Sequence, residues 1–411
     1  MTESGHWRTS GDFSPIYGIH NHPPGGALAQ MQMNMNRSWT LAVIVLLATA
    51  CGGTPTGSIT TPSASPEPIA TPSAAPTPVA GACNPCLALV TLRGSTAVVV
   101  RDITDIAHPK TIGSYAADSG PTFISATEVS YVTGVKEQTN GSVAGSLYRA
   151  PLAGSPKTLV TDHGGAGAWS PDGSAVLYMT LSSTDSYTAT GTVHQLSGGH
   201  DQVLGSMPPG GGGDCQSIAT CEIPNFLDFR LMYSPDGTHI SLVTTGFGSS
   251  SFRVWASDGT VLTRNDDKGT TMSTWSGSTL YFRDSQGVQT WHDGMSSPFL
   301  PGVVWIRPQG SAAGGQIVYT VRDSSGWGHI RLVDTATRKV RELKSARTDA
   351  VFLTSRYIWY RGERACTPAE QCGSHPATHP ENGTTYIYDL QDGSETESII
   401  TGVADVWPHA A

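Results

Sequence analysis

The 411-residue chain carries 24 Lys and Arg against 33 Asp and Glu, which gives a net charge of −9 near neutral pH. An acidic balance of this size argues against nucleic acid as a partner and against electrostatic docking on anionic lipid. Only 14% of the residues are charged, while 47 glycines can supply many tight turns. A chain of this length is too long for most single cores and favours many small repeated units.

The N-terminal part divides into segments of different composition. We expect residues 1–34 to be a mis-assigned start or a disordered stretch, because a basic start followed by an apolar run begins only at the tripeptide MNR of residues 35–37. Residues 35–50 then have the pattern of a signal peptide. The apolar run, residues 41–47, is too short to span a bilayer.

The signal-like segment ends in Ala-Thr-Ala followed by Cys51, which resembles the lipobox of bacterial lipoproteins. The resemblance implies removal of the preceding residues, lipidation of Cys51 and attachment to the extracytoplasmic face of a bacterial membrane. An ordinary secretory signal or a short membrane anchor are the alternatives. Residues 51–82 are dominated by Pro, Ser, Thr, Ala and Gly, so we expect a tether without a core, with an average span of ~30 Å as a coil.

Beyond the tether, residues 83–411, the sequence repeats a phrase. AWSPDGSAVLYMT occupies residues 168–180, and LMYSPDGTHISLV occupies residues 231–243. Proline suits the second position of a turn and glycine its positive-φ position, so each Ser-Pro-Asp-Gly segment predicts a tight turn. The apolar, β-branched residues that follow, 175–181 and 239–244, predict buried strands.

Weaker copies of the repeat appear when an aromatic residue is placed at the end of each first strand. Seven positions fit this pattern: Phe123, Trp169, Tyr233, Trp275, Trp305, Phe352 and Trp407. Three further strands follow each of them at a period near forty to fifty residues, which is typical of a propeller blade. We therefore predict an all-β fold, a β-propeller of four-stranded blades, with seven favoured and six or eight still open.

The ends of the array indicate how the ring closes. The first repeat, which begins with LALVTL at residues 87–92, lacks an opening strand, and GVADVWP at residues 402–408 resembles that missing strand. A C-terminal strand carried back to the first blade would remove the exposed sheet edges. We accordingly favour a monomer.

The SPDG repeats resemble the TolB-like and WD-repeat-like propellers of bacterial envelope proteins over roughly residues 86–407. The resemblance implies the fold and not the function. The chain leaves no room for the additional α/β domain of TolB, so the partners of TolB do not carry over. Propellers of the prolyl-oligopeptidase type sit beside a hydrolase domain, which we do not expect here because no Gly-x-Ser-x-Gly elbow occurs between a strand and a helix.

Six cysteines besides Cys51 form three close pairs, which predict disulfides in an oxidising compartment. The pairs are Cys83 with Cys86, Cys215 with Cys221, and Cys366 with Cys372. A redox role for the first pair is the alternative, but such motifs usually open a helix in a βαβ unit.

Propeller topology places the connections after the second and fourth strands of each blade on one face. The long connections of this chain fall there, around residues 135–145, 181–191, 207–224 and 362–383, and we name this the loop-rich face. The opposite plain face carries the short SPDG turns and the turns between third and fourth strands. Extra loops with two of the three cysteine pairs indicate a binding surface, with tolerated surface decoration as the alternative.

Side chains that could act on the loop-rich face are few. Three aromatic residues lie in connections between second and third strands and could anchor a ligand: Tyr187, Phe247 and Trp327. Four aspartates precede the first-strand aromatics and could line the mouth of the channel: Asp118, Asp228, Asp349 and Asp405. Aspartates at strand entries are more often turn residues, so we predict no metal, no cofactor and no assigned catalytic residue.

The sequence therefore favours a non-catalytic, lipid-anchored propeller that binds a protein or an envelope polymer through its loop-rich face. The alternative is a glycan hydrolase or lyase that works at the channel mouth with aspartates such as Asp228 and Asp405. Clustered carboxyl groups with raised pKa values would favour the enzyme. A rigid aromatic surface would favour binding.

Overall fold

Strands are the regular structure of this protein wherever the computed structural model describes it. The described residues are 83–91, 95–137, 143–165, 167–181, 191–206, 229–244, 252–265, 271–311, 313–367 and 381–408. They form strands β1 to β28, with no helix among them. No helix in this part of the chain is therefore long and apolar enough to cross a membrane.

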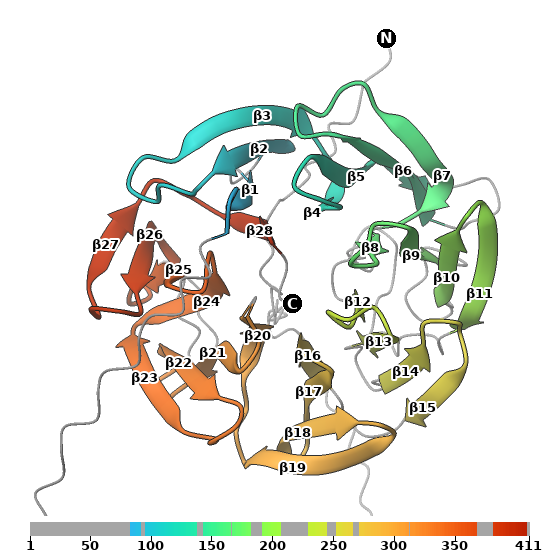
Figure 1. Ribbon diagram of the computed structural model, residues 1–411. Coiled ribbons are helices and arrows are strands. Elements are labelled where there is room, and N and C mark those ends of the chain that lie inside the picture. The colour runs from blue at the N-terminus through green and yellow to red at the C-terminus, as the bar shows by residue number, and fades with distance from the viewer. Residues whose placement is uncertain are drawn as a thin grey trace, which may run out of the picture. The chain divides into compact units, whose positions relative to one another are not determined.

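The strands form seven antiparallel four-stranded blades in a ring, which confirms the predicted propeller (Figure 1). From the inner to the outer strand, blade 1 consists of β28 (Val403–Trp407), β1 (Leu87–Thr91), β2 (Ala97–Asp102) and β3 (Lys110–Ala116). Blade 2 consists of β4 (Ser119–Phe123), β5 (Glu128–Glu137), β6 (Val143–Pro151) and β7 (Thr158–Gly164), and blade 3 of β8 (Ala168–Trp169), β9 (Ala175–Leu181), β10 (Gly191–Ser197) and β11 (His200–Ser206). Blade 4 consists of β12 (Phe229–Tyr233), β13 (His239–Thr244), β14 (Phe252–Ala256) and β15 (Val261–Asn265), and blade 5 of β16 (Thr271–Ser276), β17 (Thr279–Asp284), β18 (Gly287–His292) and β19 (Met295–Pro301). Blade 6 consists of β20 (Ile306–Gly310), β21 (Gln316–Arg322), β22 (Gly328–Asp334) and β23 (Val340–Ser345), and blade 7 of β24 (Arg347–Phe352), β25 (Tyr357–Glu363), β26 (Glu381–Asp389) and β27 (Glu395–Ser398).

The ring closes through its C-terminal strand, as the sequence predicts. β28 pairs with β1 in antiparallel register, with Trp407 opposite Leu87 and Asp405 opposite Leu89. Blade 1 thus takes its inner strand from the C-terminal end and its other three strands from the N-terminal end. Blades 2 and 3 are also joined in one sheet, because the pair Val143 and Leu181 links β6 to β9.

The two SPDG segments form the predicted turns. Gly173 and Gly237 have φ angles of 69° and 71°, in the left-handed region that favours glycine. The amide of each glycine donates to the carbonyl of the turn's serine, Ser170 or Ser234, at 2.8 Å. Each turn leads into a strand with the predicted bounds, β9 and β13.

The core of the protein lies between neighbouring blades. Trp275 at the end of β16 is buried together with Phe252 of blade 4, and the Trp275 indole Nε1 donates to the Ser241 hydroxyl at 2.9 Å. Trp169 at the end of β8 makes the same contact with Ser130 of blade 2, at 2.7 Å. The repeated first-strand aromatics are therefore packing residues at the interfaces between blades.

One predicted repeat position is wrong. Trp305 lies just before β20, and Gly310 occupies the end of that strand. A Cβ atom at Gly310 would lie only 2.2 Å from the Trp275 carbonyl oxygen, so an aromatic side chain has no room there. Trp305 fills the interface from outside the strand instead, and its Nε1 donates to the Met272 carbonyl at 3.1 Å.

The cysteine predictions are confirmed for one pair, since Cys83 and Cys86 form a disulfide. Cys366 is also disulfide-bonded, while its predicted partner Cys372 lies outside the described residues. Cys51, Cys215 and Cys221 also lie outside them, so their predicted modification and pairing stay predictions.

Candidate functional site

Four of the seven candidate side chains are among those that the structure describes: Trp327, Asp118, Asp349 and Asp405. Tyr187, Phe247 and Asp228 lie outside the described residues. The structure places Trp327 in the connection from β21 to β22 in blade 6, and Asp405 within β28 in blade 1. The two residues therefore belong to different places in the ring.

Asp405 joins blade 1 to blade 2. Its Oδ2 atom accepts a hydrogen bond from the Thr122 hydroxyl at 2.6 Å and another from the Phe123 amide at 2.8 Å. Both donors belong to β4, the inner strand of the next blade. The carboxylate thus stabilises the closed ring at the blade that the C-terminal strand completes.

Asp349 has a comparable position between blades 6 and 7. Its carboxylate forms an ion pair with Arg307 of β20 and lies 3.8 Å from Arg361 Nε of β25. Arg307 and Asp349 both have positive φ angles, 47° and 59°, at bulges in consecutive inner strands. Asp118 accepts a hydrogen bond from the Gly134 amide in its own blade. No group of three or more His, Cys, Asp or Glu among the described residues could hold a metal ion.

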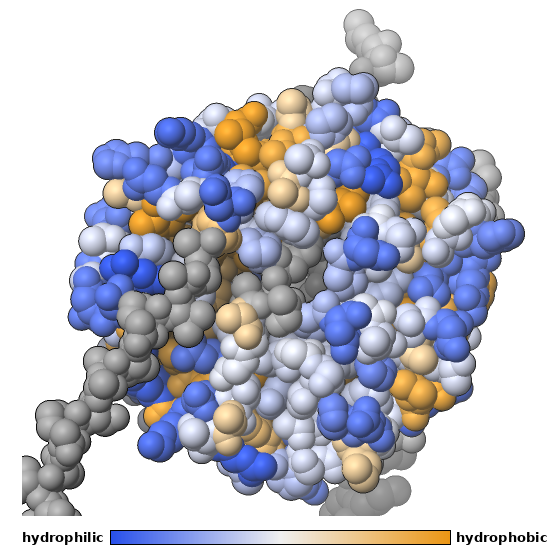
Figure 2. All heavy atoms as spheres, viewed as in Figure 1, coloured by the Kyte–Doolittle hydropathy of each residue, from blue (hydrophilic) through white to orange (hydrophobic). Residues whose placement is uncertain are grey.

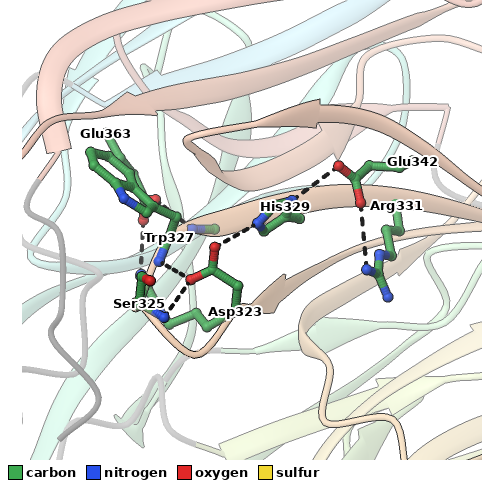
Figure 3. Close-up of polar contacts among 10 residues, drawn as sticks. Asp323, Ser325, Trp327, His329, Arg331, Glu342 and Glu363 are labelled. Carbon is green, nitrogen blue, oxygen red and sulfur yellow. Dashed lines mark hydrogen bonds and ion pairs between the residues drawn. The ribbon is translucent and has the colours of Figure 1, made fainter.

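The loop that carries Trp327 is held closed by its first residue, Asp323. The Asp323 Oδ1 atom accepts hydrogen bonds from the amides of Ser325 at 2.8 Å and Trp327 at 2.9 Å (Figure 3). The Asp323 amide in turn donates to the Trp327 carbonyl at 3.0 Å. A short Asx-type turn of this kind fixes the backbone on which the partly exposed Trp327 side chain stands.

A buried ion pair fixes the same loop against blade 7. The fully buried Glu363 carboxylate accepts from the Gly328 amide at 2.7 Å and lies 3.0 Å from an Arg322 guanidinium nitrogen. Arg322 also donates to the Gly326 carbonyl. A Cβ atom at Gly328 would lie 2.3 Å from the Arg347 carbonyl oxygen, so only glycine permits this approach of the two blades.

His329 links the loop to the outer strand of blade 6. Its Nε2 atom lies 3.1 Å from Asp323 Oδ2, and its Nδ1 atom lies 3.0 Å from Glu342 Oε1 on β23. Glu342 also accepts from Arg331 at 3.4 Å, which extends the row of charges along the sheet (Figure 3). We name the four side chains Asp323, His329, Arg331 and Glu342 the histidine cluster.

The histidine cluster shifts the pKa values of its members. Partial burial is the largest single effect on the His329 ring and opposes its charge, but hydrogen bonds to Glu342 and Asp323 and their negative charges outweigh it and raise the pKa. The hydrogen bond from His329 is the main cause that lowers the pKa of Asp323 and of Glu342. The cluster thus favours an imidazolium between two carboxylates.

Trp327 is predictable from the sequence as an aromatic loop residue, but the residues that hold its loop are not. A signal for part of the set exists, because His329 and Arg331 alternate along β22 and so face the same side of the sheet. The register that brings Glu342 opposite Arg331 is a property of the folded blade. The contact with Glu363 depends on the neighbouring blade and has no local signal.

Clustered carboxyl groups with raised pKa values would favour the predicted enzyme alternative. Among the described residues, every Asp or Glu whose pKa is shifted has a lowered value. A lowered pKa describes a carboxylate that stays ionised at neutral pH, which is the state of a general base or a nucleophile and not that of a general acid.

Comparisons with known proteins agree with the fold. No family model matches the sequence, and a comparison with curated proteins finds no match. The β-propeller domain of the trilobed protease from Pyrococcus furiosus is similar in structure, with a TM-score of 0.46 and 11% identity over 68% of this chain and 82% of that chain. TolB from Acinetobacter baumannii gives a TM-score of 0.41 and 14% identity over 78% of this chain and 82% of TolB.

A prolyl endopeptidase gives a TM-score of 0.50 and 10% identity over 76% of this chain, which spans only 49% of that enzyme. At these identities the likeness concerns the fold alone. The expected similarity to TolB is therefore found at the level of a β-propeller. The order and pairing of its strands define this chain as a seven-bladed β-propeller protein.

Proposed function

We propose that this protein is a non-catalytic binding module of a bacterial cell envelope, which recognises a protein or an envelope polymer through its loop-rich face. The observation that carries the proposal is the fixed conformation of the Trp327 loop. Asp323 closes the loop, and Glu363 fastens it to blade 7. The partly exposed indole thus stands on a backbone that is already ordered.

Order of this kind favours binding for a thermodynamic reason. Ordering a loop on association costs free energy, and a loop that is ordered beforehand avoids much of that cost. Tryptophan contributes a large rigid contact area and is among the residues that most often dominate binding surfaces. The contacts of Asp405 with β4 give this aspartate a role in ring closure, which supports binding more than hydrolysis.

The proposal includes a membrane anchor at Cys51, with residues 51–82 as the tether. A lipid-linked thioether on Cys51 would hold the propeller at the extracytoplasmic surface, and the tether would let it reach a partner. Cys51→Ala should release the protein from the membrane fraction. Mass spectrometry of the N-terminal peptide should detect the lipid on the wild-type protein alone.

The binding test compares the partly exposed Trp327 with an exposed apolar side chain on the opposite face, Met295. Full-length protein in detergent is immobilised, and its partners are sought in an envelope extract and on a glycan array. Trp327→Ala should abolish the interaction, while Met295→Ala should preserve it, because Met295 is 74% exposed next to a plain-face turn. Binding that survives Trp327→Ala would contradict the role of this loop, and detected glycan cleavage would favour the hydrolase.

A further inference from the structure

His329 is the one side chain that connects the Trp327 loop to the outer strand of its blade within the histidine cluster. Each of its two ring nitrogens faces a carboxylate oxygen, Asp323 Oδ2 at 3.1 Å and Glu342 Oε1 at 3.0 Å. Carboxylates only accept hydrogen bonds, so both contacts require a ring N–H. A neutral imidazole has a single N–H and can satisfy one of them, while the other carboxylate meets a lone pair.

Among the described residues, the charged groups that contact the ring or its partners belong to blade 6. Asp323 faces it from the loop, Glu342 from β23, and Arg331 lies beyond Glu342 on β22. Lys344 of β23 lies opposite Ile330, which faces the other side of the sheet. The ring is four-fifths buried, so water replaces a lost contact only in part.

We propose that His329 is a positioning residue of the loop-rich face. Its imidazolium ties the Trp327 loop to β23, so the loop is ordered while the ring is protonated and loosens when the ring loses its proton. The effect on ligand binding rests on the function proposed above. The effect on loop order does not, because it concerns the unliganded protein.

The direction of the pH dependence follows from the shifted groups. The pKa of His329 is raised above the unfolded value, so the stabilisation is complete below the unfolded pKa and is lost as the pH rises through the folded one. The pKa values of Asp323 and Glu342 are lowered, so their contribution is lost only as the pH falls below their usual range. The loop is thus most ordered between these limits.

Hydrogen exchange of the Ser325 and Trp327 amides measures the order of the loop directly, because both amides donate to Asp323. Exchange of the full-length protein is followed by mass spectrometry between about pH 5.5 and about pH 8.5, with labelling times scaled for intrinsic exchange. We expect protection of residues 322–328 to fall roughly three- to tenfold across this range in the wild-type protein. The SPDG turn at residues 170–174 serves as an internal control and should keep its protection.

Two variants separate positioning from a general effect of pH. His329→Gln cannot titrate, so protection of the loop should be low and independent of pH. Glu342→Gln removes one carboxylate and should move the loss of protection to lower pH. Constant protection in the wild-type protein, or an equal fall in His329→Gln, would overturn the proposal, and circular dichroism establishes that each variant is folded.

The two proposals can fail separately. The binding test identifies a ligand of the wild-type protein. The affinity for this ligand is measured at about pH 5.5 and about pH 8.5, alongside the exchange experiment. If Trp327→Ala binds normally while protection follows His329, the binding function at this loop is wrong and the positioning role stands. If Trp327→Ala abolishes binding while protection ignores His329, the function stands and the positioning role is wrong.

Discussion

Two indole N–H groups make the same contact in different interfaces of the ring, which allows the contribution of a single hydrogen bond to be tested twice. Trp275 donates to Ser241, and Trp169 donates to Ser130. Both hydroxyls belong to residues without solvent exposure. A buried hydroxyl that loses its donor has no water to replace it, so these contacts should hold neighbouring blades together.

Trp275→Phe keeps an aromatic ring in the interface and removes the donor. We expect a loss of about 1–2 kcal/mol in the free energy of unfolding, measured by urea denaturation of the full-length chain. Ser241→Ala should cost about 1 kcal/mol, and the double variant should lose less than the sum because the two side chains act on one bond. Strict additivity would show that the hydrogen bond contributes nothing beyond packing.

Substitution of Asp405 tests whether this residue stabilises the closed ring or takes part in catalysis. Because its carboxylate accepts from Thr122 and the Phe123 amide, Asp405→Ala should destabilise the protein by about 2–3 kcal/mol. Ligand binding by the folded variant at low temperature should remain unchanged. A variant of wild-type stability that loses a measured glycan-cleaving activity would instead identify Asp405 as a catalytic residue.

The SPDG turn is held by hydrogen bonds of its aspartate side chain as well as by its backbone. Asp172 accepts from the Ser170 hydroxyl at 2.6 Å and from the Ser174 amide at 3.1 Å. Asp236 repeats these contacts with Ser234 and Thr238 at 2.6 and 3.0 Å. The sequence motif therefore encodes both the chain reversal and the hydrogen bonds that hold it.

These turns should make the stability of the protein sensitive to acid. The hydrogen bond from Ser170 is the main cause that lowers the pKa of Asp172. Burial is the largest effect on Asp236 and opposes its charge, but hydrogen bonds from Ser234 and Thr238 outweigh burial and lower the pKa of Asp236 as well. A lowered pKa gives stability that is present above the unfolded value and lost as the pH falls through the folded value. The double variant Asp172→Asn, Asp236→Asn should therefore lose less stability on acidification than the wild-type protein, as measured by thermal unfolding from neutral pH downward. An unchanged acid dependence would exclude the two turns as its source.

Local chemistry explains why some elements are predictable from the sequence and others are not. The turn at Gly173 and the strand after it follow from residues that are adjacent in the chain. The end of β20 does not, because the carbonyl oxygen of Trp275 in the neighbouring blade forbids a side chain at Gly310 and displaces the aromatic ring to Trp305. Likewise, Trp327 is visible in the sequence as an aromatic loop residue, while Glu363 becomes relevant only through contact between blades.

Exposed large apolar side chains of the described strands lie on the outer strands of the blades. Examples are Leu159 of β7, Val261 of β15 and Met295 of β19. Figure 2 shows such hydrophobic residues scattered among hydrophilic ones over the visible face, without one continuous apolar patch. Apolar side chains that are scattered in this way are normal on protein surfaces.

Ring closure by β28 makes the two ends of the propeller interdependent. Truncation after Thr401 would remove the strand that pairs with β1 and leave the buried Leu87 and Leu89 on an open edge. An open, apolar edge pairs readily with another chain, so the truncated protein should form dimers or larger species in size-exclusion chromatography with light scattering.

Because Trp407 lies opposite Leu87 in antiparallel register, residues 402–408 can be placed directly before Cys83 through a short glycine linker. This permuted chain should be monomeric and close to the wild-type protein in stability. If it aggregates as much as the truncated protein, the order of the strands in the chain is required for ring closure in addition to their pairing.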